Sequence, residues 1–444
     1  MIVKHSKNFF HNYPSYALLV ALISLTIIGA ILLALPISHK VSMSAIDFFF
    51  TSASLTTVTG LLTVPLENFT PFGKVIILLL MQIGGIGLMT ISLFFIYIFL
   101  RFRFSTQILA TELLSISSFK DTKQILFFMI KLTIIAELFG AVVIFFAIKS
   151  NFDFWPAIFV SLFHSVSAFA NAGFLLFADG AVDSHNYLLI FITTLLIIVG
   201  GLGFITWHEI LGKFSSSHRF HKNISWHTKM VIRIYFLTTL ASFILIWITE
   251  RNNTLAQMSI FQALYTALFM AVSAKSAGFL PFALSSMNLT TILLFMVTMF
   301  IGSAPASTGS GIKTGVFSIC LAVIRAAVLG RSQAEINGRR MIPEQIYKAI
   351  AIVMLSIFWI LFITFCLLIT ESNWTFIDVF LESISAFTNN GISSGKTVTL
   401  SYAGKILISM SMIIGRIGAL AITLGITKTT AHAILYPEEK VLLG

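Results

Sequence analysis

Long uncharged apolar runs are the feature that most constrains how this chain can fold. Residues 16–35 and 75–100 carry no charged side chain, and a helix of about 20 apolar residues crosses the hydrocarbon core of a bilayer. The chain is 57% hydrophobic and only 10% charged, which lies outside the range of soluble proteins. The sequence predicts an all-α integral membrane protein. With the first two runs, eight transmembrane helices are expected, the others at 126–148, 187–207, 234–249, 289–312, 349–370 and 406–426.

The first run has an alternative interpretation as a secretory signal peptide, because Lys4 and Lys7 precede it. The run is longer than a usual signal core, and no small-x-small cleavage site follows it directly. A retained first helix is therefore expected. Cys320 and Cys366 lie inside apolar runs, so a disulfide framework is not expected.

Four copies of one unit follow each other along the chain. Between the two apolar runs of each pair lies a shorter segment that ends in a glycine signature: TVTGL (57–61), ANAGF (170–174), KSAGF (275–279) and TNNGI (388–392). The signature glycines are 113, 105 and 113 residues apart. The second run of each pair carries another glycine mark, 24, 27, 24 and 24 residues later: IGGIG, VGGLG, IGSAP and IGRIG. This periodicity predicts four repeats, at 1–112, 113–222, 223–342 and 343–444, each reading helix, re-entrant segment, glycine signature, helix.

The distribution of loop charges sets the expected topology. If each short segment enters the membrane and returns, all linkers between repeats lie on one side. Those linkers are rich in Lys and Arg, whereas the loops within repeats carry Asp and Glu, such as Glu67, Asp153 and Asp378. The positive-inside rule then places both termini and all linkers in the cytoplasm of a multi-pass plasma (inner) membrane protein. The linkers also account for most of the net charge of +11 without nucleic acid as a partner.

The four re-entrant segments are expected to form an ion filter. Irregular backbone at membrane depth must be buried in protein or line a water-filled path. Residues 45–56 would form a half-membrane helix whose C-terminal end, with its partial negative charge, faces a central axis. The carbonyls that follow could replace the water shell of a cation. The alternative is that the glycines only permit close helix packing. The expected filter residues are Thr57, Val58, Thr59, Gly60, Ala170, Asn171, Ala172, Gly173, Lys275, Ser276, Ala277, Gly278, Thr388, Asn389, Asn390 and Gly391.

These motifs resemble the Trk/Ktr/HKT superfamily of potassium transporters, most closely the bacterial Ktr membrane subunit. The similarity runs through the four filter glycines, the interrupted helix of the third repeat and the Arg in IGRIG, and covers essentially the whole chain. It implies a single-chain, four-fold pseudosymmetric pathway with potassium at the filter carbonyls, a homodimer, and a separate cytosolic nucleotide-binding regulatory ring. Two departures stand out. Lys275 stands where relatives commonly have Arg, and only the first filter reads TVTG, so looser selectivity is expected.

The segment GSAPASTGSGIKTG (302–315) is expected to interrupt the second helix of the third repeat. Pro305 and four glycines disfavour a continuous helix. A packing break is one interpretation. The other, which is also the family's assignment, is an intramembrane loop that obstructs the path under the filter. The expected gate comprises Gly302, Ser303, Ala304, Pro305, Ala306, Ser307, Thr308, Gly309, Ser310, Gly311, Lys313 and Arg416.

Two charged residues within apolar runs need a function. Arg416 either lines the path as a positive barrier below the filter, which is favoured, or serves as a structural hydrogen-bond hub. Glu137 is expected to anchor backbone amides that support the filter, with direct ion binding as the alternative.

Two other function classes would require different sequence features. A membrane hydrolase would need a nucleophile paired with a base, or two carboxylates four residues apart within a span, and neither is present, so no enzyme is expected. A secondary transporter of another monovalent cation or small solute would predict inverted repeats, whereas these repeats run parallel. No cofactor is expected in this chain; potassium is the expected substrate, with sodium dependence left open, and the lipid bilayer is the expected environment.

Overall fold

The computed structural model describes residues 14–86, 120–177, 182–213 and 224–418. Its regular secondary structure is helical apart from one antiparallel hairpin of two-residue strands, β1 (Glu335–Ile336) and β2 (Arg339–Arg340), and an isolated bridge. The outer helices are α2 (Pro14–Leu33), α4 (Pro71–Ile86), α7 (Lys120–Ile148), α9 (Tyr187–Gly201), α11 (Trp226–Glu250), α13 (Leu289–Phe300), α14 (Thr314–Val328), α15 (Pro343–Thr370) and α17 (Tyr402–Ile417). The remaining helices are α3 (Ala45–Thr57), α8 (Phe154–Ala170), α10 (Phe204–Lys213), α12 (Ile260–Ser276) and α16 (Phe376–Thr388), with 3₁₀ turns η1 (Leu66–Asn68), η2 (Leu284–Ser286) and η3 (Lys396–Thr399).

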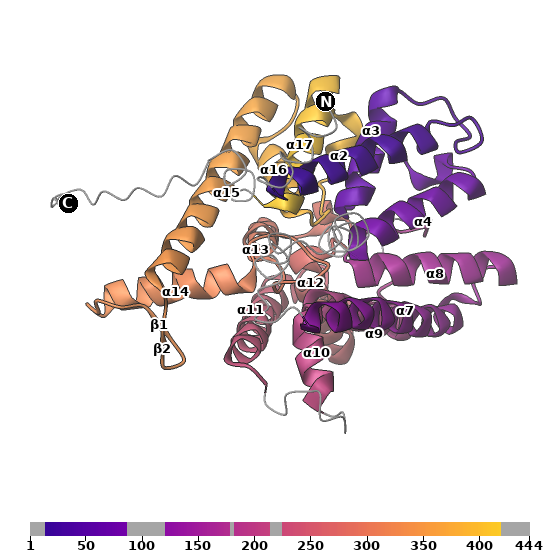
Figure 1. The fold of residues 1–444 in the computed structure, drawn as a ribbon. Helices are drawn as coiled ribbons and strands as arrows, with labels where there is room; N and C mark the ends of the chain where they lie inside the picture. Colours follow the sequence, from indigo (N-terminus) through magenta and orange to yellow (C-terminus); the bar gives the residue numbers. More distant parts are fainter. Residues whose placement is uncertain (1–13, 87–119, 178–181, 214–223, 419–444) are drawn as a thin grey trace.

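The helices follow one order four times. In each case a helix (α2, α7, α11 or α15) packs against a buried helix (α3, α8, α12 or α16), and a further helix (α4, α9, α13 or α17) returns from it. The buried helices lie toward the middle of the molecule, as Figure 1 shows for α12 and α16. α3 spans Ala45–Thr57, close to the predicted half-membrane helix at 45–56.

Small hydroxyl-bearing side chains allow these four helices to be buried. The Thr57 hydroxyl donates to the Ala53 carbonyl at 2.6 Å, and the Ser383 hydroxyl donates to the Val379 carbonyl at 2.8 Å. A buried polar group costs little when it is hydrogen-bonded. Small side chains also let helix backbones approach closely.

The outer surface of the longest helices is apolar. Phe139, Phe236 and Phe365 are 58%, 62% and 64% exposed and lie on α7, α11 and α15. By length and composition, three described helices could each cross a membrane, and the bent pair α9–α10 adds a fourth if it counts as one span. Side chains of this kind are solvated by lipid rather than water.

Two of the expected spans are interrupted, one against the prediction and one in agreement with it. The run 187–207 bends by 98° between α9 and α10, where Gly203 has φ +87°. The run 289–312 is helical only to Phe300 and resumes as α14 at Thr314, so the predicted break in this helix is confirmed. In Figure 1, α14 and the hairpin project on the side of the molecule away from α8. The ends of the runs 75–100 and 406–426, beyond residues 86 and 418, lie outside the described residues.

Two buried glutamates join the first and last helices of a unit. Glu250, the last residue of α11, accepts hydrogen bonds from the Asn288 amide at 2.9 Å and from the Thr291 hydroxyl at the start of α13. Glu371, directly after α15, accepts from the Ser401 amide at 3.2 Å and its hydroxyl at 2.5 Å, at the start of α17. Each carboxylate thus satisfies donors at a helix N-terminus.

An ion pair joins the beginning of the chain to its end. Lys405 of α17 contacts Asp47 of α3 at 2.6 Å, and Asp47 also accepts from the Thr63 hydroxyl at 2.9 Å. The two charged side chains are only 15% and 11% exposed. The contact of α17 with α3 closes the arrangement of the four units.

Asp47→Ala is expected to destabilise the protein by about 3 kcal/mol or more, because it leaves the Lys405 ammonium charged and unpaired in a largely buried position. Thermal unfolding of the purified protein in detergent measures this. The double variant Asp47→Ala/Lys405→Met should recover part of the loss, and Glu344→Ala, which removes one partner of the exposed pair Glu344–Lys348, should have little effect. A double variant no more stable than Asp47→Ala would contradict this account.

Candidate functional site

The four signature glycines form a closed ring. A β-carbon added to each glycine would collide with the carbonyl oxygen of the residue that precedes the next glycine along the chain, and the last glycine meets the first segment. The φ angles of the four glycines are +100°, +72°, +68° and +91°, a region that other residues rarely adopt. Two of these distances are 2.6 Å. The four contacts are Gly60 to Ala172, Gly173 to Ala277, Gly278 to Asn390 and Gly391 to Thr59.

The carbonyl groups of this ring have no hydrogen-bond donor among the described residues. Within the described part of the chain, no hydrogen bond is donated to the carbonyls of the four glycines or of the residues that precede them. The preceding residues, Thr59, Ala172, Ala277 and Asn390, are all fully buried. Buried carbonyls normally have a partner, and a group of such oxygens can coordinate a cation. The four buried helices also direct their C-terminal ends, with their partial negative charge, to this place.

Serine side chains hold the four segments, in units one, two and four by accepting from an amide and in unit three through Ser273, whose hydroxyl donates to the Phe279 carbonyl at 2.6 Å. Ser54, Ser167 and Ser385 stand six residues before the signature glycine in units one, two and four. Their hydroxyls accept from the amides of Gly60, Phe174 and Gly391 at 3.2, 2.9 and 3.0 Å. Sequence reasoning missed these residues. Their signal is the shared serine in SASLTTVTG, SVSAFANAG and SISAFTNNG.

The third segment is built differently because it is one residue shorter. In the other units a non-glycine residue two before the glycine ends the helix with positive φ: Val58 (+58°), Asn171 (+59°) and Asn389 (+50°). The segment VSAKSAG lacks one residue relative to VSAFANAG. Consequently α12 continues through Ser276, and Ala277 follows with φ −115°.

Lys275 therefore lies inside a helix, and its side chain does not reach the ring. Its ammonium group donates to the Tyr235 carbonyl at 2.9 Å and the Thr238 hydroxyl at 2.6 Å, and lies 3.9 Å from the centre of the Tyr235 ring. The ammonium group is thus directed away from the ring, whereas the expected filter role of KSAGF concerns its backbone carbonyls and stays a prediction. Lys275 instead joins α12 to α11.

Polar side chains next to the ring connect neighbouring segments. Asn171 accepts from the Ser276 hydroxyl at 3.1 Å, Asn389 donates to the Thr59 hydroxyl at 2.9 Å, and Asn390 donates to the Ala274 carbonyl at 3.0 Å. The Thr57 and Thr59 hydroxyls are 2.7 Å apart, and Thr388 bonds back to its own helix at Ile384. Ala170 is buried against Gly85. These side chains therefore leave the ring to backbone carbonyls.

The second glycine marks pack against the ends of the buried helices. A β-carbon on Gly84, Gly200 or Gly415 would meet a carbonyl four residues before the signature glycine. Those carbonyls belong to Thr56 (2.5 Å), Phe169 and Phe387. Gly302 differs because it follows the end of α13 and faces the Ser310 carbonyl of its own loop.

The loop 301–313 folds on itself and rests against unit two. The Ser303 amide donates to the Ser310 carbonyl at 3.2 Å, and the Thr314 amide donates to the Ser303 carbonyl at 3.1 Å. The Thr308 hydroxyl donates to the Phe169 carbonyl at 3.1 Å and lies 2.6 Å from the Asn171 amide nitrogen. The loop is thus attached beneath the second segment of the ring. Its other predicted members are Ala304, Pro305, Ala306 (φ +53°), Ser307, Gly309 and Gly311 (φ +76°).

Arg416 binds this loop to the first unit. Its guanidinium donates to the Thr308 carbonyl at 2.7 Å, to the Ser310 hydroxyl at 2.9 Å and to the Gly84 carbonyl at 2.6 Å. Lys313 donates to the Gly309 carbonyl at 2.5 Å. Hydrogen bonds from a charged donor are stronger than neutral ones, so both cations act on the position of the loop.

Glu137 connects three helices of the described part of the chain. Its carboxylate accepts from the Gln82 side-chain amide of α4 at 3.0 and 2.9 Å, and its carbonyl accepts from the Ser165 hydroxyl of α8 at 2.7 Å. Among the described residues, the partner of its carboxylate is Gln82, and the expected anchoring of backbone amides stays a prediction. Groups of three or more His, Cys, Asp or Glu that could hold a metal ion are absent from the described residues.

Comparison with known proteins gives concordant results. A family model described as a cation transport protein, TrkH, matches residues 82–436. The Ktr system potassium uptake protein B of Bacillus subtilis is 34% identical over 436 residues, 97% of each chain. The potassium/sodium uptake protein NtpJ of Enterococcus hirae is 32% identical over 432 residues, 95% of each chain. The crystal structure of the potassium transporter TrkH from Vibrio parahaemolyticus shares the fold, with a TM-score of 0.70 at 20% identity over 94% of this chain and 85% of that one.

Gly415→Ala is expected to lower stability by about 1–3 kcal/mol, the usual cost of overpacking, because the methyl group would collide with the Phe387 carbonyl. Gly315→Ala is the matched control: its nearest neighbour, Pro305 Cγ, is 3.7 Å away, and alanine in a helix should stabilise by about 0.4–1 kcal/mol. Thermal unfolding in detergent measures both. Equal effects of the same sign would show that the close approach of Gly415 is unimportant.

Proposed function

This chain belongs to the TrkH family of cation transport proteins, and we propose that it is the translocating subunit of a potassium uptake system. Potassium would pass through the ring formed by the four signature glycines. The relatives named for potassium uptake match over nearly the full chain, which supports potassium as the substrate. The name of the Enterococcus hirae relative includes sodium as well, so sodium coupling or permeation belongs to the proposal.

The observation that carries this proposal is the closed ring of buried, unbonded carbonyls. Backbone oxygens of Thr59, Ala172, Ala277 and Asn390 approach the neighbouring glycines around one centre. Such oxygens can take the place of a cation's water shell. The mechanism is therefore exchange of water for carbonyls at the ring, favoured by the C-terminal ends of four helices.

The four units would be pseudo-symmetric repeats around one pathway, with eight transmembrane helices and the boundaries 1–112, 113–222, 223–342 and 343–444. The equivalent contacts of Gly84, Gly200 and Gly415 support this. The termini and inter-repeat linkers would be cytoplasmic, because the linkers hold most of the cations.

The loop 301–313 would be the gate, held by Arg416 and Lys313. Its attachment to Phe169 and Asn171 places it directly beside the ring. Movement of this loop would require the Arg416 contacts to break. A homodimer and a separate cytosolic nucleotide-binding ring of the Ktr type complete the proposal. The relatives' designation as part of a Ktr system supports a multicomponent assembly, and the basic linkers would be the docking surface.

Potassium uptake in a bacterial host that lacks its own uptake systems tests the proposed function. Cells that express the chain, with and without a cytosolic regulatory subunit, should grow at potassium concentrations that do not support the host. No uptake of labelled potassium or rubidium in either case, with the protein present in the membrane, would refute the proposal.

Gly391→Ala is expected to reduce the ratio of potassium to sodium uptake by about tenfold or more, a loss of about 1.4 kcal/mol of discrimination. The methyl group would displace the Thr59 carbonyl from the ring. Gly338→Ala is the control: it has the same kind of positive φ (+74°) but no neighbour within 4 Å. Unchanged ion preference in Gly391→Ala would argue against a filter at this ring.

Arg416→Ser is expected to raise potassium flux by about tenfold, because it removes three charge-assisted hydrogen bonds, each worth about 1.5–3 kcal/mol, that hold the loop. Arg331→Ser, which removes an exposed cation paired with Glu335, should leave flux unchanged. Flux is compared at matched membrane expression. A folded Arg416→Ser protein with wild-type or lower flux would support a purely structural hub.

A further inference from the structure

The fourth buried helix carries a line of polar side chains that follows the chain leaving the ring. Asp378, Glu382 and Ser385 are spaced four and three residues apart, so they share one face of α16. We name these three residues the α16 stripe. The Ser385 hydroxyl accepts a hydrogen bond from the Gly391 amide at 3.0 Å. The two carboxylates contact residues that come after Gly391.

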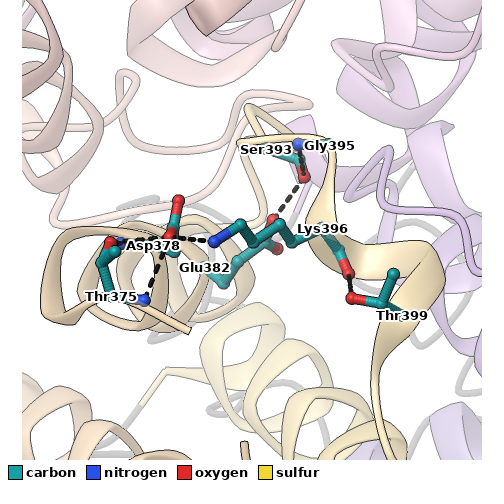
Figure 2. A network of polar contacts seen from close by, with 7 residues as sticks. All are labelled: Thr375, Asp378, Glu382, Ser393, Gly395, Lys396 and Thr399. Atoms are coloured by element: carbon teal, nitrogen blue, oxygen red, sulfur yellow. Dashed lines mark hydrogen bonds and ion pairs between the residues drawn. The ribbon is translucent and has the colours of Figure 1, made fainter. Parts of the chain in front are cut away.

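Glu382 holds the first residues after the ring. It is fully buried and accepts hydrogen bonds from the hydroxyls of Ser393 and Thr397, the latter at 3.0 Å. The Ser393 and Thr397 hydroxyls also lie 2.7 Å apart, and the Gly395 amide donates to the Ser393 hydroxyl at 2.9 Å. Figure 2 shows the Glu382 carboxylate directed from α16 toward Ser393.

Asp378 holds the chain one step further along. It pairs with Lys396 at 2.6 Å and completes a capping box with Thr375 at the start of α16. Figure 2 shows Lys396 extended across to Asp378, beside Glu382. The stripe therefore fixes residues 391–397 at three successive points, all on one rigid element.

The other units lack a carboxylate at the middle position. Nine residues before the signature glycine stand Thr51 in unit one and His164 in unit two. The Thr51 hydroxyl is buried without a hydrogen-bond partner in the described part of the chain, and His164 Nε2 lies 2.8 Å from Thr193 of α9. The shortened third segment has Met270 one turn before Ala274. Glu382 thus gives the fourth segment a carboxylate at this position. In unit one the chain after the ring is held by Asp47, thirteen residues before Gly60, which accepts from the Thr63 hydroxyl at 2.9 Å.

We propose that Glu382 is a positioning residue that fixes the carbonyl of Gly391 through Ser393 and Thr397 and so sets the preference for potassium over sodium. The proposal rests on the ring being the ion filter. Gly391 lies between two anchors on the same helix, Ser385 before it and Glu382 after it. Loss of the second anchor leaves residues 392–397 to move, and a ring that adapts its diameter discriminates less between cations of different size.

The test compares potassium and sodium uptake for Glu382→Ala, Glu382→Gln and Ser393→Ala/Thr397→Val in cells that lack other uptake systems. We expect about a tenfold fall in the ratio for Glu382→Ala and for the double variant, equal to about 1.4 kcal/mol. Glu382→Gln should keep most of the ratio, because its carbonyl oxygen still accepts from both hydroxyls. The double variant, which leaves the helix intact, serves if Glu382→Ala fails to fold.

Glu371→Gln and Glu371→Ala are the matched controls. Glu371 is also a buried glutamate bonded to a serine hydroxyl, but at the start of α17. Its variants should lose thermal stability and keep the wild-type ion ratio. An unchanged ratio in the Glu382 variants, or a Glu382→Gln as poor as Glu382→Ala beside a normal double variant, would overturn the positioning role. Absence of potassium uptake by the wild-type chain would instead refute the proposed function itself.

Discussion

The structure depends on the contact between each signature glycine and a carbonyl of the next segment. These contacts bring four stretches of non-helical backbone together at one place, and such backbone is tolerated inside a membrane only when protein buries it. Every other feature of the centre serves that requirement. The buried helices use Ser and Thr that bond to their own carbonyls, and Gly84, Gly200 and Gly415 allow the outer helices to approach without a side chain between them.

The contacts that close the ring join residues that are far apart in the sequence. Asp47 meets Lys405, Thr59 meets Asn389, and Gly84 meets Arg416. Each joins the first unit to the last, so the ring exists only when the whole chain has folded. The loop 301–313 is part of the same network, because Arg416 bonds to this loop and to α4 with one guanidinium. A change in the position of the loop must therefore alter contacts of the first and fourth units together.

The sequence predicted the class of protein, the four segments and the break in the third unit, because hydropathy and glycine spacing report directly on helix length and backbone angle. The predicted resemblance to the Trk/Ktr family and the prediction of a cation transporter rather than an enzyme are confirmed by the family match. The directions of side chains were harder to predict from the sequence. The Lys275 ammonium faces Tyr235 because the missing residue in VSAKSAG extends α12, and the spacing to Gly278 does not predict this direction. The 98° bend at Gly203 was also missed, since a single glycine in an apolar run does not distinguish packing from a break. The hydrogen bond between Glu137 and Gln82 joins residues 55 positions apart, so no local sequence pattern predicts it.

The four segments are equivalent in position but not in how firmly they are held. Units one, two and four end their buried helices with a positive-φ residue at the same position and with a serine that accepts from an amide. The third unit has neither: its Ser273 donates to the Phe279 carbonyl instead, and its second helix is interrupted. The fourth has the additional acceptor Glu382 beside its exit. The centre thus has a firmly supported part, the fourth segment, and a part next to the non-helical loop between α13 and α14, the shorter third segment. A protein that must select an ion and also regulate its passage needs both, because selection requires carbonyls that hold their positions and regulation requires backbone that can change them. In the proposed function, this departure from exact repetition would separate selection from regulation, although the carbonyl ring is common to all four units.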